Sequence, residues 1–339
     1  MMEGKHHAVA LLSGGLDSSL AVKMMIDQGI AVTAVHFTSP FCNCTSRKAG
    51  CKHQAVKIAD EFGISIQVVH KGLEYMKVVQ NPRHGYGRGM NPCIDCRIYM
   101  LRKVKDLMPS LKASFVITGE VLGQRPMSQH RVAIRKIEKE SGLEGRILRP
   151  LSAQHFAPTL PEQEGIIDRQ KLLSFSGRSR KPQINLAEEL GVKDYPCPAG
   201  GCLLTDPVIA ARLRDLFTYA PSYELADLHL LKIGRHFRLN PALKIVVGRN
   251  KQENEQLQVL AKPDAALFEP VDFRGPACLA TGSLNIQNEI MIGEIMARYS
   301  QDEKKRFQIL KHVREREETI FAVHKRIDRE GIALLQIGG

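Results

Sequence analysis

The chain has 339 residues, of which 43% are hydrophobic and 25% charged, and its formal net charge at pH 7 is +12. This length suits two or three globular domains, and we expect neither a signal peptide nor a transmembrane helix, because no apolar run approaches about 18 residues. The positive charge favours a polyanionic partner, nucleic acid first. Eight cysteines in a chain of this size indicate metal or redox chemistry in a reducing cytoplasm rather than a disulfide scaffold.

The first predicted element is a buried strand at residues 8–12, which runs into a glycine-rich turn at residues 13–19. A helix follows from the serines onward. A strand, a glycine turn and a helix N-terminus present backbone N–H groups to one point, and serine hydroxyls add to them, so this segment predicts an anion site. Asp17 would repel phosphate unless Mg²⁺ lay between the two.

This turn resembles the PP-loop, S-G-G-x-D-S, of the ATP pyrophosphatase superfamily. The resemblance implies cleavage of ATP into AMP and pyrophosphate, with Mg²⁺ and with transfer of AMP to a carbonyl oxygen of the substrate. It assigns a catalytic role to Asp17 and nucleotide binding to the turn, namely Ser13, Gly14, Gly15, Asp17, Ser18 and Ser19.

Strands and helices alternate after the turn. The sequence predicts strands at 31–37, 64–69 and 114–118 and helices at 54–62 and 96–107. This rhythm favours an α/β fold with a doubly wound parallel sheet, whose ligands bind at the carboxyl ends of the strands. With the PP-loop, it implies a HUP-like (adenine nucleotide alpha hydrolase) domain at residues 1–155. His36 and Phe37, at the end of the second strand, are expected to pack against adenine.

A first group of cysteines follows the second strand. Cys42, Cys44, Cys51 and His53 have the spacing C-x-C-x6-C-x-H. Such a group is read either as a separate zinc or iron–sulfur site or as free thiols near the nucleotide.

The second group begins with Asn-Pro-Cys93-Ile-Asp95-Cys96, placed at a helix start, which should lower the pKa of the thiols. With the distant Cys202, it resembles tRNA-uridine 2-sulfurtransferases. The resemblance implies sulfur transfer by Cys93 and Cys202. Iron–sulfur members of the superfamily imply instead a [4Fe–4S] cluster on Cys93, Cys96 and Cys202, with Cys197 competing for the third position. Bare thiols and Zn²⁺ remain the alternatives, and Asp95 is expected to cap its helix.

After the fourth strand, residues 118–124 read Thr-Gly-Glu-Val-Leu-Gly-Gln and resemble a loop of 4-thiouridine synthases of the PP-loop class. The resemblance places Gly119 against the nucleotide and lets Gln124 reach phosphate or the target nucleotide. Three cations between Arg178 and Lys181 suit RNA phosphates, although a solvated loop explains them equally well.

Residues 156–225 are expected to form a helical and linking region that carries the loop with Cys197 and Cys202. Asp206 should cap a helix that begins at Pro207. Residues 226–339 should form a smaller α/β domain. Its segment 247–254, Val-Gly-Arg-Asn-Lys-Gln-Glu-Asn, resembles the RNA-binding domain of NFACT proteins.

Taken together, the sequence predicts a cytoplasmic enzyme that uses ATP to thiolate a tRNA uridine. Its partners would be tRNA and a sulfur donor, either sulfide or a persulfide carrier. Whether C2 or C4 is thiolated and whether the chain forms a homodimer stay open. The alternatives are a PP-loop synthase acting on a small molecule with a zinc site, and a non-catalytic RNA-binding protein.

Overall fold

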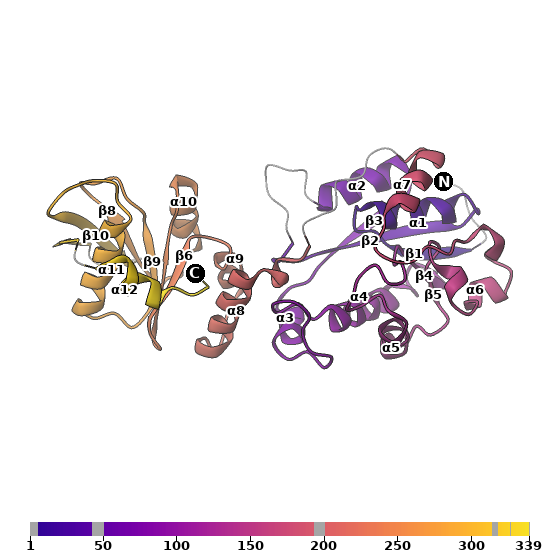
Figure 1. The fold of residues 1–339 in the computed structure, drawn as a ribbon, viewed down its shortest axis with the longest axis horizontal. Helices are drawn as coiled ribbons and strands as arrows, with labels where there is room; N and C mark the ends of the chain where they lie inside the picture. The colour runs from indigo at the N-terminus through magenta and orange to yellow at the C-terminus, as the bar shows by residue number, and fades with distance from the viewer. Residues whose placement is uncertain (1–5, 43–50, 193–200, 314–317, 326, 339) are drawn as a thin grey trace. The chain divides into compact units, whose positions relative to one another are not determined.

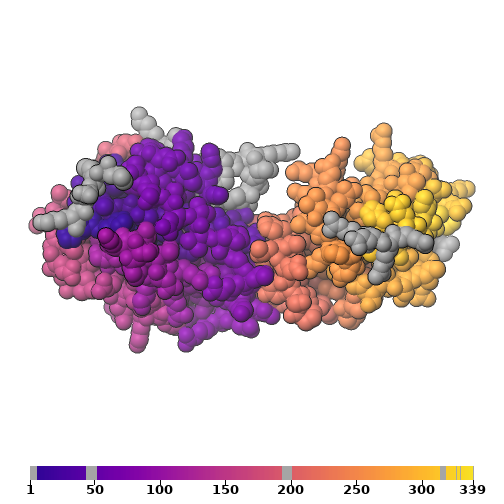
Figure 2. Space-filling model, turned by 180° about the vertical axis from the view of Figure 1, so that it is seen from behind, coloured from indigo at the N-terminus to yellow at the C-terminus, as the bar shows by residue number. Residues whose placement is uncertain are grey.

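The computed structural model describes residues 6–42, 51–192, 201–313, 318–325 and 327–338. Cys44 and Cys197 lie outside these ranges. The chain divides into two compact units, Met1–Thr205 and Asp206–Gly339, drawn as a ribbon in Figure 1 and as atoms in Figure 2. Residues 156–192 and 201–205 therefore pack with the sheet domain, whereas residues 206–225 pack with the C-terminal unit.

The first unit is built on a parallel sheet of strand order β3-β2-β1-β4-β5, which confirms the predicted fold class. Its strands are β1 (His7–Leu11), β2 (Ala31–Thr38), β3 (Ser65–His70), β4 (Phe115–Thr118) and β5 (Ile147–Leu148). Ala8 and Ala10 of β1 enter one core and Val9 and Leu11 the other, because successive side chains of a strand point to opposite faces.

Helices cover both faces of this sheet (Figure 1). They are α1 (Leu16–Ile26), α2 (Cys51–Glu61), α3 (Leu73–Gln80), α4 (Cys93–Leu107), α5 (Arg131–Ser141), α6 (Leu160–Gln163) and α7 (Lys181–Glu189), with 3-10 turns η1 (Ala153–His155), η2 (Arg169–Lys171) and η3 (Leu203–Thr205). Helices α1, α2 and α7 pack on one face, and α4 and α5 on the other. Helix α4 begins at Cys93, three residues before the predicted start, so both of its thiols lie in its first turn.

The second unit has an antiparallel sheet of order β11-β10-β8-β9-β7-β6. Its strands are β6 (Arg235–Asn240), β7 (Leu243–Val247), β8 (Ala266–Pro270), β9 (Cys278–Gly282), β10 (Phe307–Val313) and β11 (Thr319–Val323), and its helices are α8 (Pro207–Tyr219), α9 (Leu225–Leu230), α10 (Lys251–Leu260), α11 (Ile286–Arg298) and α12 (Arg329–Leu335). Asp206 caps α8 as predicted, accepting the N–H groups of Val208 and Ile209. Within the described ranges, none of the helices is both long enough and apolar enough to cross a membrane.

Candidate active site

The PP-loop joins β1 to α1 at the carboxyl edge of the parallel sheet. Gly14 adopts a positive φ of 79°, which glycine tolerates without a Cβ clash. The carbonyl of Gly15 accepts the N–H groups of Ser18 and Ser19 at 3.1 and 3.2 Å and both serine hydroxyls. The Ser13 and Ser18 hydroxyls lie 3.1 Å apart. The loop therefore forms the tight strand-to-helix turn that the sequence predicted.

Asp17 is the meeting point of two distant segments. Its Oδ2 accepts a hydrogen bond from Gln124 Nε2 at 2.9 Å and faces the Arg180 guanidinium at 3.3 Å. Its other oxygen, Oδ1, is buried and has no hydrogen-bond partner within the described ranges. A buried carboxylate oxygen without a partner is the kind of donor that a hard cation such as Mg²⁺ takes, so Asp17 fits the predicted magnesium ligand.

Gly119 packs against the PP-loop itself. A Cβ at this position would lie 2.5 Å from the backbone carbonyl of Asp17 and from the Ser18 nitrogen, a distance that no side chain tolerates. The end of β4 can therefore reach α1 only through glycine. The loop after it carries Gln124 to Asp17, while the charge of Arg125 acts on the Cys93 thiol. Residues of one loop thus act on both the PP-loop and the Cys93 thiol.

His36 and Phe37 lie beside this turn, at the end of β2. His36 is only 2% exposed, and its Nδ1 lies 2.8 Å from the Leu12 carbonyl oxygen. Burial lowers the pKa of His36, so the ring is neutral near pH 7. Phe37 packs partly against the core on the α4 side of the sheet. Contact of either residue with adenine stays a prediction.

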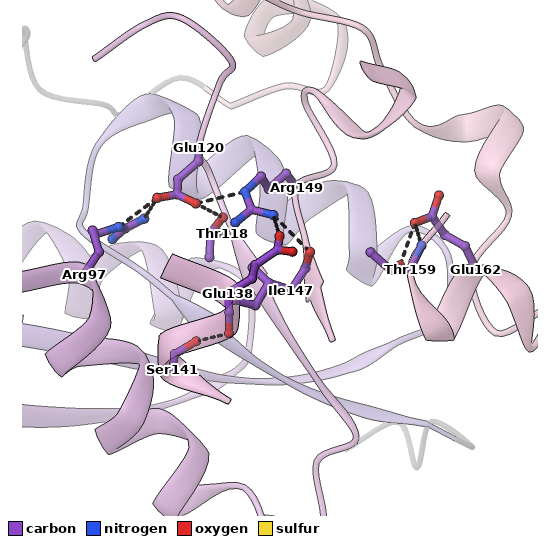
Figure 3. A network of polar contacts seen from close by, with 9 residues as sticks. All are labelled: Arg97, Thr118, Glu120, Glu138, Ser141, Ile147, Arg149, Thr159 and Glu162. Carbon is purple, nitrogen blue, oxygen red and sulfur yellow. Dashed lines mark hydrogen bonds and ion pairs between the residues drawn. The ribbon is translucent and has the colours of Figure 1, made fainter. Parts of the chain in front are cut away.

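A buried ion-pair network fixes the start of α4 to the sheet (Figure 3). Glu120, 2% exposed, pairs with Arg97 of α4 at 2.7 Å and with the buried Arg149 at 3.0 Å. Burial alone would raise the pKa of Glu120, but the two guanidinium groups outweigh it and hold this pKa at about 2. Since Arg97 follows Cys96 directly, the network holds the thiol-bearing turn beside Gly119.

Cys93 and Cys96 occupy the first turn of α4. Burial and the neighbouring Cys96 raise the pKa of Cys93, with Arg125 acting in the opposite direction. The prediction of a lowered pKa was therefore wrong for Cys93, because burial and Cys96 outweigh Arg125, Asn91 and Arg97. The capping role of Asp95 was also wrong, since its carboxylate accepts the backbone N–H groups of Arg83 and His84 at 3.1 Å each and ties down the preceding loop.

Cys202 reaches the same region from the far end of the first unit. Its neighbour Leu203 donates its N–H to the Phe41 carbonyl, and Cys202 forms a backbone bridge with Cys42. Burial raises the pKa of Cys202 to about 11. Cys42 is therefore paired with Cys202 through the backbone. His53 is exposed on α2, and the Cys44 and Cys51 side chains lie outside the described structure, so a metal site on that group stays a prediction.

Lys71, at the carboxyl end of β3, is a site residue that sequence analysis missed. Its Nζ donates to Cys96 Sγ at 3.5 Å and lies 4.6 Å from the centre of the Tyr75 ring. Burial would lower the pKa of Lys71, but Cys96, Cys202 and Cys42 raise it. A lysine after a strand carries no motif, so nothing in the sequence marked this position.

The thiols do not form a ready metal site as they stand. Among the residues with described positions, no three His, Cys, Asp or Glu side chains converge on a point that would hold a metal ion. Cys93, Cys96 and Cys202 would have to move to hold a cluster, and the Lys71 ammonium now contacts Cys96. Cluster and zinc ligation by these cysteines both remain predictions.

In the second unit, the segment 247–254 forms the turn between β7 and α10. Asn250 Oδ1 caps α10 by accepting the Glu253 N–H at 3.0 Å, and Asn254 Oδ1 accepts the Ala277 N–H at 3.1 Å. Arg249 pairs with Glu253 and remains 46% exposed. The asparagines thus shape the turn, and Arg249 presents charge on it. Cys278 is fully buried, as expected of a core thiol.

Comparisons with known proteins divide along the same two units. Residues 4–155 match the family described as thiamine biosynthesis protein (ThiI), and residues 234–332 match the NFACT protein RNA binding domain. A probable tRNA sulfurtransferase of Methanothermobacter thermautotrophicus is 31% identical over 119 residues, covering 34% of this chain and 29% of that protein. The tRNA-specific 2-thiouridylase MnmA of Syntrophotalea carbinolica is 29% identical over 127 residues, covering 35% of this chain and 36% of that protein.

A solved 4-thiouridine synthetase–RNA complex with bound ATP has 22% identity and a TM-score of 0.39, covering 67% of this chain and 52% of that one. This chain spans only about a third of the length of the curated relatives it matches. The ThiI match confirms the PP-loop resemblance of the first unit, and the NFACT match confirms the RNA-binding-domain resemblance of the second. The chain therefore combines a PP-loop domain of the ThiI type with an RNA-binding domain of the NFACT type.

Proposed function

We propose that this chain uses ATP to thiolate a uridine of tRNA. The observation that carries the proposal is the convergence of an ATP-type loop and a set of thiols at the carboxyl edge of one parallel sheet. In the loop after β4, Gln124 bonds Asp17 and the charge of Arg125 lowers the pKa of Cys93. Activation by ATP and sulfur transfer can therefore act on one bound base.

The PP-loop would bind the β- and γ-phosphates of ATP. Backbone N–H groups at the start of α1 and the hydroxyls of Ser13 and Ser18 are the donors available to phosphate. Asp17, with its unpartnered Oδ1, would hold Mg²⁺, which neutralises phosphate charge when bound. Arg180 lies 3.3 Å from Asp17 and adds a cation where the phosphates would bind.

In the reaction, the uridine carbonyl oxygen attacks the α-phosphorus of ATP and pyrophosphate leaves. The adenylated base then carries AMP as its leaving group, and sulfur displaces it. Fixed backbone dipoles and the Arg180 guanidinium would stabilise the charge that develops on phosphate in the first step. Gly119 allows the end of β4 to lie against the loop, which positions Gln124.

The sulfur step is assigned to Cys93 and Cys202. Sulfide would displace AMP directly. A persulfide formed on either cysteine from a carrier would displace AMP and leave the base joined to that cysteine by a disulfide. The thiol of the other cysteine would then attack this bond, release the thiolated base and close a Cys93–Cys202 disulfide, which a small thiol would reduce. Near neutral pH both residues are thiols, because burial raises the pKa of each. A [4Fe–4S] cluster on Cys93, Cys96 and Cys202 would supply an iron open to sulfide, and iron, sulfide and zinc counts after anaerobic purification test that prediction.

The second unit would bind the tRNA. An NFACT-type RNA-binding domain and a net charge of +12 both favour a phosphate backbone as ligand. Arg249 and Lys251, at the start of α10, are exposed cations of the segment 247–254. The proposed cytoplasmic location follows from a tRNA substrate.

The decisive experiment incubates the chain anaerobically with tRNA that lacks thiolated bases, ATP, Mg²⁺ and sulfide. Nucleosides are then analysed by mass spectrometry, and pyrophosphate release is measured in parallel. We expect 2-thiouridine or 4-thiouridine, and the digest distinguishes C2 from C4. Asp17→Asn should abolish both products, and Cys202→Ser should abolish thiolation while leaving pyrophosphate release.

Cys278→Ala is the matched control, since this thiol is buried in the second unit and should not affect either product. ATP turnover without a thiolated nucleoside would contradict the proposal and favour a small-molecule synthase. RNA binding with no ATP turnover on any tRNA would favour a non-catalytic binding protein.

A further inference from the structure

The backbone geometry around Cys42 and Cys202 places the two thiols opposite each other. The residues form an antiparallel bridge, and Leu203 N–H donates to Phe41 O at 3.0 Å. This bond joins the residue after Cys202 to the residue before Cys42, the pattern that flanks a non-hydrogen-bonded pair. In such a pair the Cα atoms are about 4.5 Å apart, within the range of about 4.4–6.8 Å that a disulfide spans.

The Cys202 side of the pairing is held in place. The segment after Cys202 is fixed by the Met90 N–H, which donates to Leu204 O at 2.8 Å. No side chain could be added at Gly89 without meeting this segment, since a Cβ there would lie 2.4 Å from Leu204 O. Cys42 and Cys202 are both half-buried, so a small reagent can reach them, in contrast to the fully buried Cys278.

Cys96 is the competing partner for Cys202, since the sulfurs of Cys96 and Cys42 both lie near enough to act on Cys202. Cys42 is the one that the backbone pairs with Cys202, so the geometry selects Cys42.

We propose that Cys42 and Cys202 are a redox pair that closes and opens a disulfide at the active site. One thiol loses its proton and attacks a low-molecular-weight disulfide, which forms a mixed disulfide and releases one small thiolate. The second thiol loses its proton and attacks the mixed disulfide, which closes the Cys42–Cys202 bond and releases the other. Two protein thiols are oxidised while one small disulfide is reduced to two thiols, and a dithiol reverses the reaction.

The consequence for catalysis rests on the proposed function. A closed disulfide withdraws Cys202 from sulfur transfer and from any metal, so the oxidised chain would be inactive in thiolation. The pair itself is independent of that function, because it follows from the backbone bridge alone.

The test starts from the reduced full chain, which is incubated with oxidised glutathione, alkylated, digested and mapped by mass spectrometry. We expect a Cys42–Cys202 linkage as the main disulfide, lost in Cys42→Ser and Cys42→Ala and retained in Cys96→Ser. Circular dichroism verifies that the variants fold. A main linkage of Cys202 to Cys93 or Cys96, or a Cys202 that stays open to alkylation, would overturn the proposal.

Thiolation is then measured before and after oxidation. The wild-type chain should lose its activity on oxidation and regain it with dithiothreitol, whereas Cys42→Ser should keep the activity it had before. Equal loss in Cys42→Ser would contradict the switch. If no preparation thiolates tRNA although the linkage forms, the proposed function fails and the redox pair stands.

Discussion

Replacing Glu120 by Gln should destabilise the first unit strongly near neutral pH. The carboxylate is held by Arg97 and Arg149, and its pKa is lowered from 4.5 to about 2. Each pKa unit corresponds to ~1.4 kcal/mol, so the lowering corresponds to roughly 3 kcal/mol of unfolding free energy. Glutamine keeps the shape but removes one of the two carboxylates that pair with Arg149, which is 3% exposed and keeps only Glu138, and breaking a buried pair costs a similar amount, about 3–5 kcal/mol.

The pH dependence follows from the sign of this change. A lowered carboxyl pKa stabilises the fold fully above pH about 4.5, and the contribution is lost as the pH falls towards about 2. The gap between wild type and Glu120→Gln should therefore be largest near pH 7 and narrow below pH about 4.5. Lost anchoring of Arg97 should also raise the alkylation rate of Cys96.

The assay is urea unfolding of the full chain followed by circular dichroism, since the sequence has no tryptophan. Only the transition of the first unit should move. Glu74→Gln is the matched control, because Glu74 and its partner Lys103 are 65% and 37% exposed and exposed pairs contribute about 1 kcal/mol or less. If the two variants lose the same stability, or if the Glu120→Gln deficit does not change with pH, the reasoning about the buried network is refuted.

Three further predictions concern single positions. Arg180→Ala should weaken ATP binding about tenfold while AMP binding is unchanged, because the guanidinium lies at Asp17 and charge-assisted hydrogen bonds contribute about 1.5–3 kcal/mol. Calorimetry measures both affinities, with Arg178→Ala, an exposed cation of the same loop, as the control. An equal loss of ATP affinity in both variants would contradict the prediction. Gly119→Ala should abolish ATP binding, since its Cβ meets the Asp17 backbone at 2.5 Å, and retained affinity in equilibrium dialysis would count against that contact. Asn250→Ala should lower the stability of the second unit by about 1 kcal/mol through loss of the helix cap, and Asn250→Ser should recover most of it. Thermal unfolding measures both variants, and an alanine variant as stable as the wild type would show that the cap does not stabilise the unit.

The elements that were predicted correctly from the sequence depend on residues close together in the chain. The PP-loop, the strand before it and the parallel sheet follow from apolar runs and glycine positions that act within a few residues. The start of α4 was predicted three residues too late, although Pro92 directly precedes it. Asp95 looks like a capping residue, but its partners lie on the loop before the helix.

What the sequence could not predict depends on contacts between distant segments. Arg180 meets Asp17 across 163 positions of the chain, and Cys42 meets Cys202 through a backbone bridge. Lys71 contacts Cys96 from the end of another strand. No spacing pattern in the sequence links such residues, because they meet only when the strands fold into one sheet and their carboxyl ends lie along the same edge.

The hydrogen bonds within the PP-loop have a consequence for the thermodynamics of nucleotide binding. Ser13, Ser18 and Gly15 satisfy one another through hydrogen bonds within the loop, so the turn holds its shape by itself and ATP need not order it. Binding then exchanges internal hydrogen bonds for bonds to phosphate, which yields little net enthalpy per bond. The loop's selectivity for ATP over AMP should come from charge, and it should therefore weaken as the salt concentration rises.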